Sequence, residues 1–517
     1  MRFTNRVWFG LLAGLIALNL ILRYPVTPHE IGWDTFTIHV LTNSISEFGW
    51  ARWWVNSLSI AGFYPNSYAS AVPFLVSGIS QCTCVNMEWT VWLFCTLTGI
   101  FTIFFAFVLA GVLWDNDLFK FLVAFGYSLA PGLLYFSTWQ LSTRGLFIIL
   151  LPLFIYLLLK TRDSLKYVPL AIILFTVLVV THHLFYFTIP IILSYITAVI
   201  LYKLKGHIKV KIPDFANVSF IGVFVIMLSL AFFTYLFISE TGSKYEWVIL
   251  LAQTYVRHVG VLLVFAIGSF VYLSLKNNKN FEEWFLLLSL ICLTPLLYMY
   301  RYSKWFFVIF AIILASISLS NVAKTYNSKK RKYTLVIIVI VLLLSVSFSG
   351  FYQHYRNIAG TATPNERYME DGTYVAGLWI KDNINKDKRM VCNEYIAARI
   401  FAISEVPTLI GEGTIDMTYG FTNITDLNIS KVSPLSTMYY FEGPYIRTPH
   451  TPYTGYYCSL LNEVDFASYW GRPIISRFNL SYVIENEDIG DNPFIRSVHR
   501  EKDTIYDNAK IRVWCLD

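Results

Sequence analysis

Charged residues are scarce in this 517-residue chain: they make up 14% of it, whereas hydrophobic residues make up 56%. The mean hydropathy of +0.53 is too high for a water-soluble enzyme of this length. The sequence contains no glycine-rich phosphate loop, no G-x-S-x-G elbow and no H-E-x-x-H helix. These absences argue against a nucleotide-driven pump and against the common membrane peptidases. The composition instead predicts a polytopic α-helical membrane protein.

Cysteine is also rare, and its seven copies show no metal-ligand spacing beyond the C-x-C of Cys82 and Cys84. Cys392, Cys458 and Cys515 fall in the C-terminal region, where one disulfide could form if that region faces an oxidising compartment, although the sequence does not indicate which pair. The net charge is +7, but the basic residues cluster between hydrophobic segments, where membrane topology accounts for them. Nucleic acid is therefore not an expected partner.

Apolar segments long enough to cross a bilayer recur through residues 1–350. A helix of about 20 apolar residues spans a hydrocarbon core about 30 Å thick. Segments of that length number about eleven. They lie near residues 7–23, 89–113, 119–138, 145–160, 167–182, 184–202, 217–238, 258–275, 283–299, 304–322 and 333–350. No small-residue cleavage site follows the first segment, so we expect it to be retained as a span.

Lysine and arginine crowd alternate loops, which predicts the orientation of the chain in the cell membrane. Basic residues precede the first span and follow the fourth, sixth, eighth and tenth, all of which fall on one side. Since cytoplasmic loops carry the excess of lysine and arginine, the N-terminus is expected in the cytoplasm. The opposite, extracytoplasmic face would then carry residues 24–88, 139–144, 239–257, 300–303 and everything after 350.

The predicted domains are a multi-span domain over 1–350 and a soluble α/β domain over 351–517. The first outer loop, 24–88, is too apolar and aromatic for a free linker, so we expect short helices lying along the membrane interface. After residue 350 the composition becomes that of a soluble protein. Residues 374–413 predict helix, strand, helix and strand, and segments 480–488 and 509–517 predict late strands.

Acidic residues stand directly after the first predicted span, in the stretch HEIGWD at 29–34. The segment Thr27 to Glu30 fits a capping box, and a helix there would place Asp34 and Glu30 on one face about 5–6 Å apart. Such a pair could accept a proton from a nucleophile or hold a divalent cation, Mg²⁺ or Mn²⁺. Glu30 is equally explained as a structural cap, and His29 and His39 are expected to be interface residues.

Two basic clusters stand at predicted outer ends of spans. Arg144 precedes the fourth span, and Tyr300, Arg301 and Lys304 precede the tenth. A guanidinium matches phosphate oxygens with two parallel hydrogen bonds, so an anionic lipid headgroup is a plausible ligand. Snorkelling to the membrane interface is the alternative for Arg144.

Two further outer segments carry ionisable groups. Glu240, Glu246 and Arg257 flank an apolar stretch that would suit a loop closing over a lipid substrate, or a plain amphipathic connector. His182 and His183 join the fifth and sixth spans, as a proton-transfer pair or as solvated turn residues.

The layout of a first span, a long acidic outer loop, many spans and a C-terminal outer domain resembles the type C (GT-C) membrane glycosyltransferases. The likeness rests on HEIGWD (29–34), FYPNSYASAVPFLVSG (63–78) and YRYSKWFFVIFAIIL (300–314). The C-terminal segments VCNEYIAARIFAISEVP (391–407) and TIYDNAKIRVW (504–514) look most like archaeal oligosaccharyltransferase-like members. Protein O-mannosyltransferases share this layout.

The resemblance implies an enzyme that transfers a sugar from a polyprenyl-phosphate donor, within membrane lipids, to a protein or glycolipid acceptor. By it, Asp34, with or without Glu30, takes the place of the acid that activates the acceptor or binds metal, and Arg301 that of the basic residue that grips the donor phosphate. Arg144 stands where the family usually carries a second acid, and the W-W-D-Y-G motif is absent, which favours transfer of a monosaccharide or short glycan. The alternatives are a transporter or flippase for a lipid-linked or anionic solute and a non-catalytic envelope assembly protein.

Overall fold

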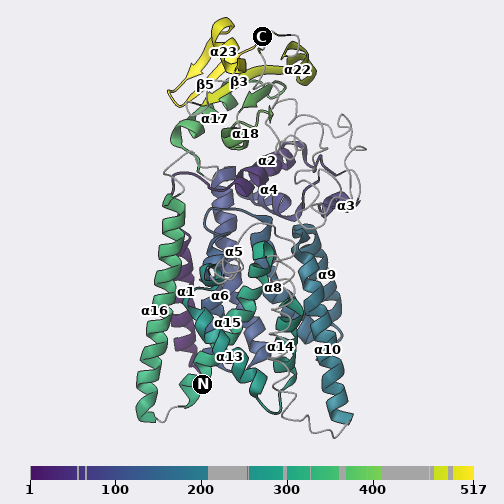
Figure 1. Cartoon of the computed structure of the whole chain (residues 1–517), viewed down its shortest axis with the longest axis vertical. Coiled ribbons are helices and arrows are strands. Elements are labelled where there is room, and N and C mark those ends of the chain that lie inside the picture. Colours follow the sequence, from purple (N-terminus) through teal and green to yellow (C-terminus); the bar gives the residue numbers. More distant parts are fainter. Residues whose placement is uncertain are drawn as a thin grey trace, which may run out of the picture.

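The structure of the chain is a computed structural model. It describes residues 2–54, 57–63, 67–207, 253, 255–294, 300–325, 328–359, 368–392, 394–409, 465, 468, 471–486 and 493–516. A bundle of helices carries the N-terminus at one end, and a small sheet with the C-terminus lies beyond the other end (Figure 1). Helices from the first loop, α2 and α4, lie between the bundle and the sheet.

The bundle is built from apolar helices, most of them long, and a few short helical turns. In chain order they are α1 (Asn5–Leu22), α5 (Met87–Leu113), α6 (Asp117–Ser128), α7 (Pro131–Leu134), α8 (Thr143–Lys160), α9 (Tyr167–Thr181), the 3-10 turn η1 (His183–Phe187), α10 (Thr188–His207), the 3-10 turn η2 (Gly260–Leu262), α13 (Leu263–Leu275), α14 (Phe281–Leu293), α15 (Tyr300–Thr325) and α16 (Ser328–Ala359). The main apolar core lies among α5, α6, α8, α10, α13, α14 and α15.

Seven helices within the described part of the chain are long and apolar enough to cross a membrane, which makes this a multi-pass membrane protein. Predicted spans near 167–182 and 283–299 correspond to shorter helices, α9 and α14. The span predicted over 217–238 lies outside the described residues. The number of about eleven therefore stays a prediction.

One predicted span, 119–138, is wrong as a single helix. Helix α6 ends at Ser128, Ala130 takes an extended conformation, and α7 begins at Pro131. Proline lacks the N–H that a continuing helix would need, and it disfavours helical geometry in the preceding residue. The chain after this break, residues 135–142, runs irregularly towards the start of α8.

The first loop folds into α2 (Trp33–Phe48), α3 (Ser57–Ile60) and α4 (Ala71–Thr83). Helix α2 is covered by protein on several sides, and its predicted position along the membrane interface stays a prediction. Phe36 and Val40 pack against the C-terminal domain, whereas Ile38 packs against α4 and α5. The Asn43 side-chain amide adds a 2.9 Å hydrogen bond to the carbonyl of Ala402. Burial on opposite faces fixes the helix that carries Asp34.

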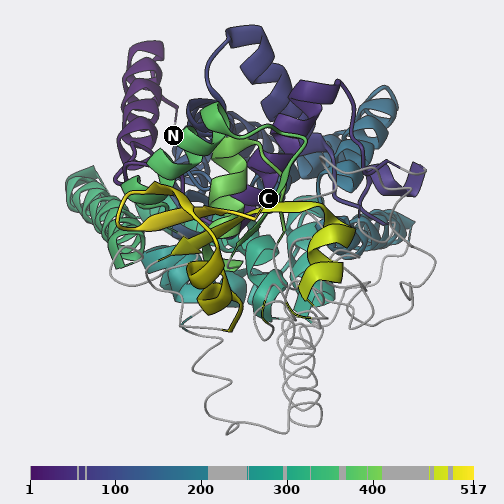
Figure 2. The ribbon, with the colours of Figure 1, turned by 90° about the horizontal axis from the view of Figure 1, so that it is seen from above.

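The C-terminal region contains the predicted order of helix, strand, helix and strand. Its elements are α17 (Asp371–Asn383), β1 (Arg389–Cys392), α18 (Glu394–Ser404), β2 (Thr408–Leu409), α22 (Gly471–Phe478), β3 (Leu480–Asn486), α23 (Pro493–Glu501), β4 (Thr504–Asp507) and β5 (Ile511–Cys515). The sheet order is β2-β1-β3-β5-β4, with parallel pairing around β1 and antiparallel pairing around β5. Viewed from above, this domain covers the centre of the bundle (Figure 2). Helix α16 continues to Ala359, past the domain boundary predicted at 350.

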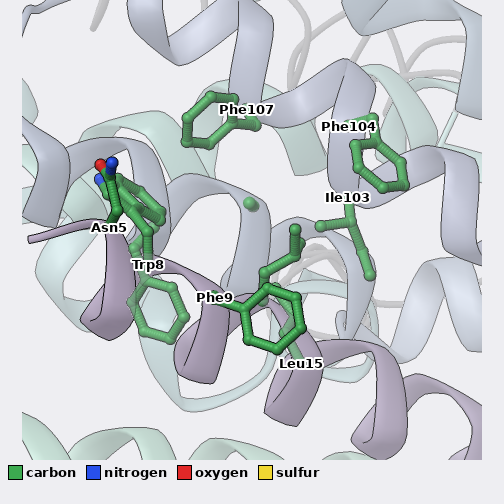
Figure 3. A pocket seen from close by; sticks show the side chains of 10 residues that line it. Asn5, Trp8, Phe9, Leu15, Ile103, Phe104 and Phe107 are labelled. Carbon is green, nitrogen blue, oxygen red and sulfur yellow. The ribbon is translucent and has the colours of Figure 1, made fainter.

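A groove of about 480 Å³ opens between α1, α5 and α6 (Figure 3). Its lining is almost entirely apolar, with Trp8, Phe9, Phe104 and Phe107 among the side chains. None of the ionisable residues singled out from the sequence lines it. The groove is therefore not the candidate site.

Candidate functional site

The structure brings Asp34 and Arg144 together from distant parts of the sequence. Asp34 lies in the first turn of α2, and Arg144 in the first turn of α8. Arg144 Nη2 lies 3.6 Å from Asp34 Oδ2, and the two side chains are 29% and 34% exposed. The Ser142 hydroxyl donates to the same oxygen of Asp34 at 2.9 Å. An acid and a guanidinium thus meet at one partly open position.

The loop before α8 is held in place by the residues that precede and begin α2. The Leu141 N–H donates to the Thr35 hydroxyl at 2.9 Å, and the Ile31 N–H donates to the Trp139 carbonyl. Trp139 has φ of 52°, a left-handed conformation that costs a non-glycine residue energy. Gly32, with φ of 102°, leaves no room for a Cβ beside Gln140. These contacts align the two helix starts that carry Asp34 and Arg144.

Ser142 and Asp34 both stand at helix N-termini, where their oxygen atoms are stabilised. Ser142 is the N-cap of α8, and its hydroxyl accepts the backbone N–H of Arg144 at 3.3 Å while donating to Asp34. A carboxylate near a helix N-terminus is stabilised by the backbone dipoles, as Asp34 is at α2. The capping serine is thus also the link between the two charged residues.

Aromatic rings extend the site towards α15. The Arg144 guanidinium carbon lies 6.0 Å from the centre of the Phe136 ring, and Phe136 packs on Trp305 with ring centres 4.7 Å apart. Lys304 Nζ lies 4.9 Å from the Trp305 ring, and His258 meets the same ring edge-on at 4.4 Å. Lys304, predicted from the sequence, therefore connects to Arg144 through two aromatic rings.

The other predicted residues lie in varied surroundings. His182 and His183 are both buried, with ring centres 4.0 Å apart, so the alternative of solvated turn residues is wrong. Arg257 is exposed on the helical segment before η2. Tyr300 and Arg301 lie in the first turn of α15, but their side chains are not among those described. Glu240 and Glu246 lie outside the described residues.

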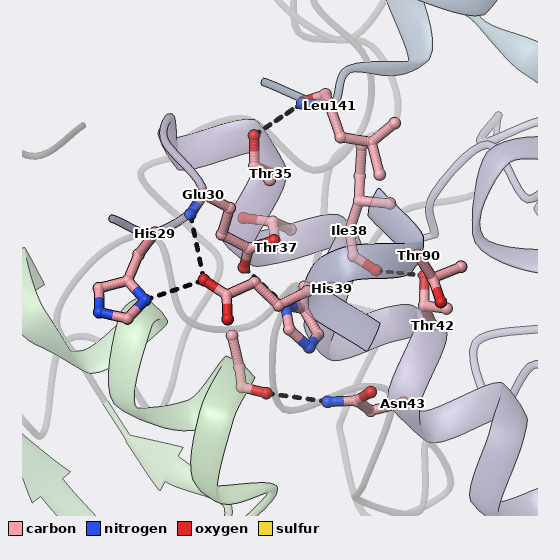
Figure 4. Close-up of polar contacts among 12 residues, drawn as sticks. His29, Glu30, Thr35, Thr37, Ile38, His39, Thr42, Asn43, Thr90 and Leu141 are labelled. Atoms are coloured by element: carbon pink, nitrogen blue, oxygen red, sulfur yellow. Dashed lines mark hydrogen bonds and ion pairs between the residues drawn. The ribbon is translucent and has the colours of Figure 1, made fainter. Parts of the chain in front are cut away.

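Glu30 occupies a different place from Asp34. It is fully buried, and its Oε1 lies 2.6 Å from His39 Nδ1. Its backbone N–H donates to Glu88 Oε1, which also contacts His29 Nδ1 at 2.9 Å (Figure 4). His29 Nε2 reaches Asp371 of α17 at 3.3 Å. These residues form a buried polar network that joins the first loop, α5 and the C-terminal domain.

The predicted capping box is therefore wrong. Helix α2 begins at Trp33 with Gly32 as its N-cap, so Glu30 precedes the helix and has no one-turn relation to Asp34. The Thr27 hydroxyl instead donates to the carbonyl of His29. The expectation that His29 and His39 lie at an interface is also wrong, since both are largely buried partners of carboxylates.

The described residues do not fit a metal site that Asp34 and Glu30 share. Glu30 is bonded to His39, whereas Asp34 faces a permanently charged guanidinium that competes with a cation for its oxygens. No group of three or more His, Cys, Asp or Glu side chains suited to a metal ion occurs among the described residues. Use of Mg²⁺ or Mn²⁺ stays a prediction.

Of the three possible pairings among Cys392, Cys458 and Cys515, the structure tests only that of Cys392 with Cys515. Cys392 ends β1 and Cys515 ends β5, and β3 separates the two strands in the sheet. No disulfide joins them. Cys458 lies outside the described residues.

Several residues of this region gave no signal in the sequence. Ser142 reads as an ordinary helix cap, Phe136 and Trp305 as core aromatics, and Glu88 as a helix-start acid. Arg23, at the end of α1, is fully buried and hydrogen-bonded to Asn19, Ser128 and Ser137. Only the charge of Arg23 beside an apolar span could have marked it.

Burial raises the pKa of Glu30 above its ordinary value of 4.5, and His39 opposes that rise. The folded protein then retains the Glu30 proton at a pH where the unfolded chain has lost it, so this group lowers stability as pH rises above 4.5. Glu30→Gln removes the titration. Between about pH 4.5 and pH 7 the wild type should lose stability relative to the variant. We therefore expect the melting temperature of Glu30→Gln to rise relative to that of the wild type over this range. A difference that stays constant with pH for Glu30→Gln would refute the assignment.

No family model matches this sequence, and no curated protein matches it. Solved structures do match: the chain has the fold of the GT-C membrane glycosyltransferases, as the sequence resemblance predicted. The crystal structure of the Archaeoglobus fulgidus oligosaccharyltransferase in complex with Zn and sulfate aligns with 92% of this chain and 68% of its own, at a TM-score of 0.60 and 13% identity.

Two further solved structures align with this chain. The archaeal oligosaccharyltransferase AglB from Archaeoglobus fulgidus, in complex with an inhibitory peptide and a dolichol-phosphate, aligns over 94% of this chain and 70% of its own, with a TM-score of 0.59 and 13% identity. ArnT from Cupriavidus metallidurans bound to undecaprenyl phosphate covers 99% of this chain and 98% of its own, with a TM-score of 0.47 and 11% identity. At 13% identity and TM-scores of 0.60 and 0.59, the likeness to the two oligosaccharyltransferase structures establishes the fold alone.

Proposed function

We propose that this protein is a membrane glycosyltransferase that moves a sugar from a polyprenyl-phosphate donor to a protein or glycolipid acceptor on the extracytoplasmic side. The observation that carries the proposal is the meeting of Asp34, in the first turn of α2, with Arg144, in the first turn of α8. Helix α2 lies between the bundle and the sheet of the C-terminal domain (Figure 1). The fold supports it, and so does the dolichol-phosphate bound by the structurally similar AglB.

The arrangement suits sugar transfer. The nucleophilic atom of the acceptor attacks the anomeric carbon, and the bond from that carbon to the phosphate oxygen breaks with its electron pair on the phosphate. Arg144 stabilises the charge on the departing phosphate. Asp34 accepts the proton of the nucleophile. In the structure Arg144 neutralises Asp34, so the donor phosphate would have to compete for the guanidinium.

Residues on α15 would complete the grip on the phosphate. Lys304 connects to Arg144 through Trp305 and Phe136, and Arg301 lies about one helical turn before Lys304. We assign Arg301 and Lys304 to donor binding, as the sequence predicts. The apolar helices around them would hold the isoprenoid chain.

The test uses purified protein in lipid vesicles with radiolabelled polyprenyl-phosphate sugars and an extract of membrane glycolipids and proteins as acceptors. We expect labelled acceptor from the wild type, a loss of at least about 100-fold for Arg144→Ala, and partial activity for Arg144→Lys, which keeps the charge but not the paired geometry. Arg162→Ala removes a cation from the turn that follows the opposite end of α8, so it is the matched control and should retain activity.

The outcomes separate the alternatives. If the labelled donor crosses the vesicle membrane without forming product, the protein is a transporter or flippase. Full activity of both Arg144 variants would show that this guanidinium only anchors the helix at the membrane interface. The absence of both product and transport with every donor would favour a structural role in the envelope.

A further inference from the structure

Ser142 lies between the two charged residues of the candidate site and contacts both. It is 2% exposed, so bulk water has little access to its hydroxyl. The hydroxyl oxygen accepts the backbone N–H of Arg144 at 3.3 Å. The same group donates its own proton to Asp34 Oδ2 at 2.9 Å. A hydroxyl has only one proton, and here that proton is directed to the carboxylate.

Two neighbouring hydrogen bonds hold the segment that carries Ser142 against the start of α2. Next to the bond between Ser142 and Asp34, the Leu141 N–H donates to the Thr35 hydroxyl at 2.9 Å. The Thr35 hydroxyl in turn donates to the carbonyl of Ile31 at 2.6 Å. Consecutive residues of one segment thus bind consecutive residues of the other. The Ser142 hydroxyl therefore has a fixed position relative to the Asp34 carboxylate.

The two oxygens of the Asp34 carboxylate have different surroundings. The Ser142 hydroxyl, at 2.9 Å, and Arg144 Nη2, at 3.6 Å, both meet the same atom, Oδ2. Within the described ranges, no hydrogen bond or ion pair of this side chain reaches Oδ1. A carboxylate oxygen accepts through its lone pairs, so Oδ1 is the oxygen left to accept a proton from another molecule. Anchoring through Oδ2 gives Oδ1 a defined direction.

We propose that Ser142 is a positioning residue, which anchors Asp34 through Oδ2 and presents Oδ1 to the acceptor. This inference rests on the proposed function. As the nucleophilic atom of the acceptor bonds to the anomeric carbon, its proton passes to Oδ1. The electron pair of the broken bond stays on the donor phosphate. Ser142 exchanges no proton with the acceptor and acts only through Asp34.

Glycine and threonine at position 142 separate positioning from helix capping. Ser142 has an extended backbone, with φ of −153° and ψ of 144°, which both residues adopt. Glycine is nearly as good an N-cap as serine but has no hydroxyl, whereas threonine keeps the hydroxyl. We expect Ser142→Gly to lower kcat about tenfold, the loss of one hydrogen bond to a charged group, and to leave KM for the donor within about twofold. Ser142→Thr should retain most of kcat.

Asn116→Gly is the matched control for capping. Asn116 is the N-cap of α6 and, like Ser142, is buried. Its side chain accepts the backbone N–H of Phe119 at 3.2 Å, at the start of its own helix. We expect kcat within about twofold of wild type, since this change removes a cap without touching Asp34. A loss of kcat as large as that of Ser142→Gly would assign the effect to capping and overturn the inference.

The decisive measurement compares kcat of Asp34→Asn, Ser142→Gly and the double variant. It uses full-length protein in lipid vesicles with radiolabelled polyprenyl-phosphate sugar, alongside thermal unfolding. Asparagine at position 34 cannot take the proton, so Ser142→Gly should then change kcat by less than about twofold.

A further tenfold loss in the Asp34→Asn background would show that Ser142 acts independently of Asp34 and would overturn the inference. Equal kcat of Ser142→Gly and Ser142→Thr, or wild-type kcat of Ser142→Gly, would do the same. In each of these cases the proposed function stands as long as Asp34→Asn is impaired. Wild-type activity of Asp34→Asn overturns both the inference and the assignment of Asp34 to the reaction.

Discussion

Asp34→Asn is expected to lower the rate of sugar transfer at least about 100-fold and to leave the protein folded. The amide has nearly the shape of the carboxylate and can still accept the hydrogen bond from Ser142, but it cannot take a proton from an acceptor. It also removes the ion pair with Arg144, which is partly exposed and contributes little to stability. The measurements are transfer of radiolabelled sugar from polyprenyl phosphate and the melting temperature in detergent.

Glu47→Gln is the matched control, because Glu47 stands on the same helix and has similar exposure, 32%, in an ion pair with Lys386. It removes a carboxylate from α2 at a distance from Arg144, and activity should stay within about twofold of wild type, as expected for a partly exposed ion pair. Equal activity of Asp34→Asn and wild type would exclude Asp34 from the reaction. Loss of folding in Asp34→Asn would make its role structural.

Gly99→Ala is expected to destabilise the protein strongly, although alanine is the better helix former. A Cβ at position 99 would lie 2.0 Å from Arg23 Nε. The guanidinium would have to leave its buried hydrogen bonds with Asn19, Ser128 and Ser137. A buried charged group deprived of its partners costs more than about 2 kcal/mol, and we expect a clear drop in melting temperature.

Gly111→Ala provides the comparison, since Gly111 lies on the same helix and its added Cβ would approach nothing closer than Lys120 Cε at 3.6 Å. This change should be neutral or should stabilise by up to about 1 kcal/mol. Arg23→Met in the Gly99→Ala background tests the cause, because the shorter apolar side chain should relieve the clash. If Gly99→Ala melts at the wild-type temperature, Arg23 has room to move and the buried cluster is not a constraint.

The fold was predictable where hydrophobic length and period decide it. Uninterrupted apolar stretches at 7–23, 89–113 and 304–322 became α1, α5 and α15, and the alternating segment near 480–488 became β3. Apolar length alone was misleading at 119–138, because Pro131 breaks a stretch that is long enough for one spanning helix. The apolar composition of a segment indicates that it lies in the membrane or the protein core. Where a helix ends depends instead on single residues such as proline.

The site was predictable residue by residue but not as a geometry. Asp34 and Arg144 were both singled out, yet their contact joins positions 34 and 144 through a tertiary arrangement that no local pattern encodes. A capping box over Thr27 to Glu30 predicts that Glu30 and Asp34 share one face of a helix. Gly32, with its positive φ, delays the helix to Trp33 and sends Glu30 into the interior instead. The sequence pattern thus indicates which residues are candidates for the site. Their partners depend on the close approach of the first loop and the segment before α8.

Helix α2, which carries Asp34, packs directly against the C-terminal domain. Phe36, less than one helical turn from Asp34, packs against residues of α18. Further along the helix, the Asn43 side chain donates a hydrogen bond to a carbonyl near the end of α18. Under the proposed function, an acceptor that binds the C-terminal domain would contact the domain that packs on α2, the helix that carries Asp34. Acceptor binding and acceptor activation would then both depend on the position of the same helix.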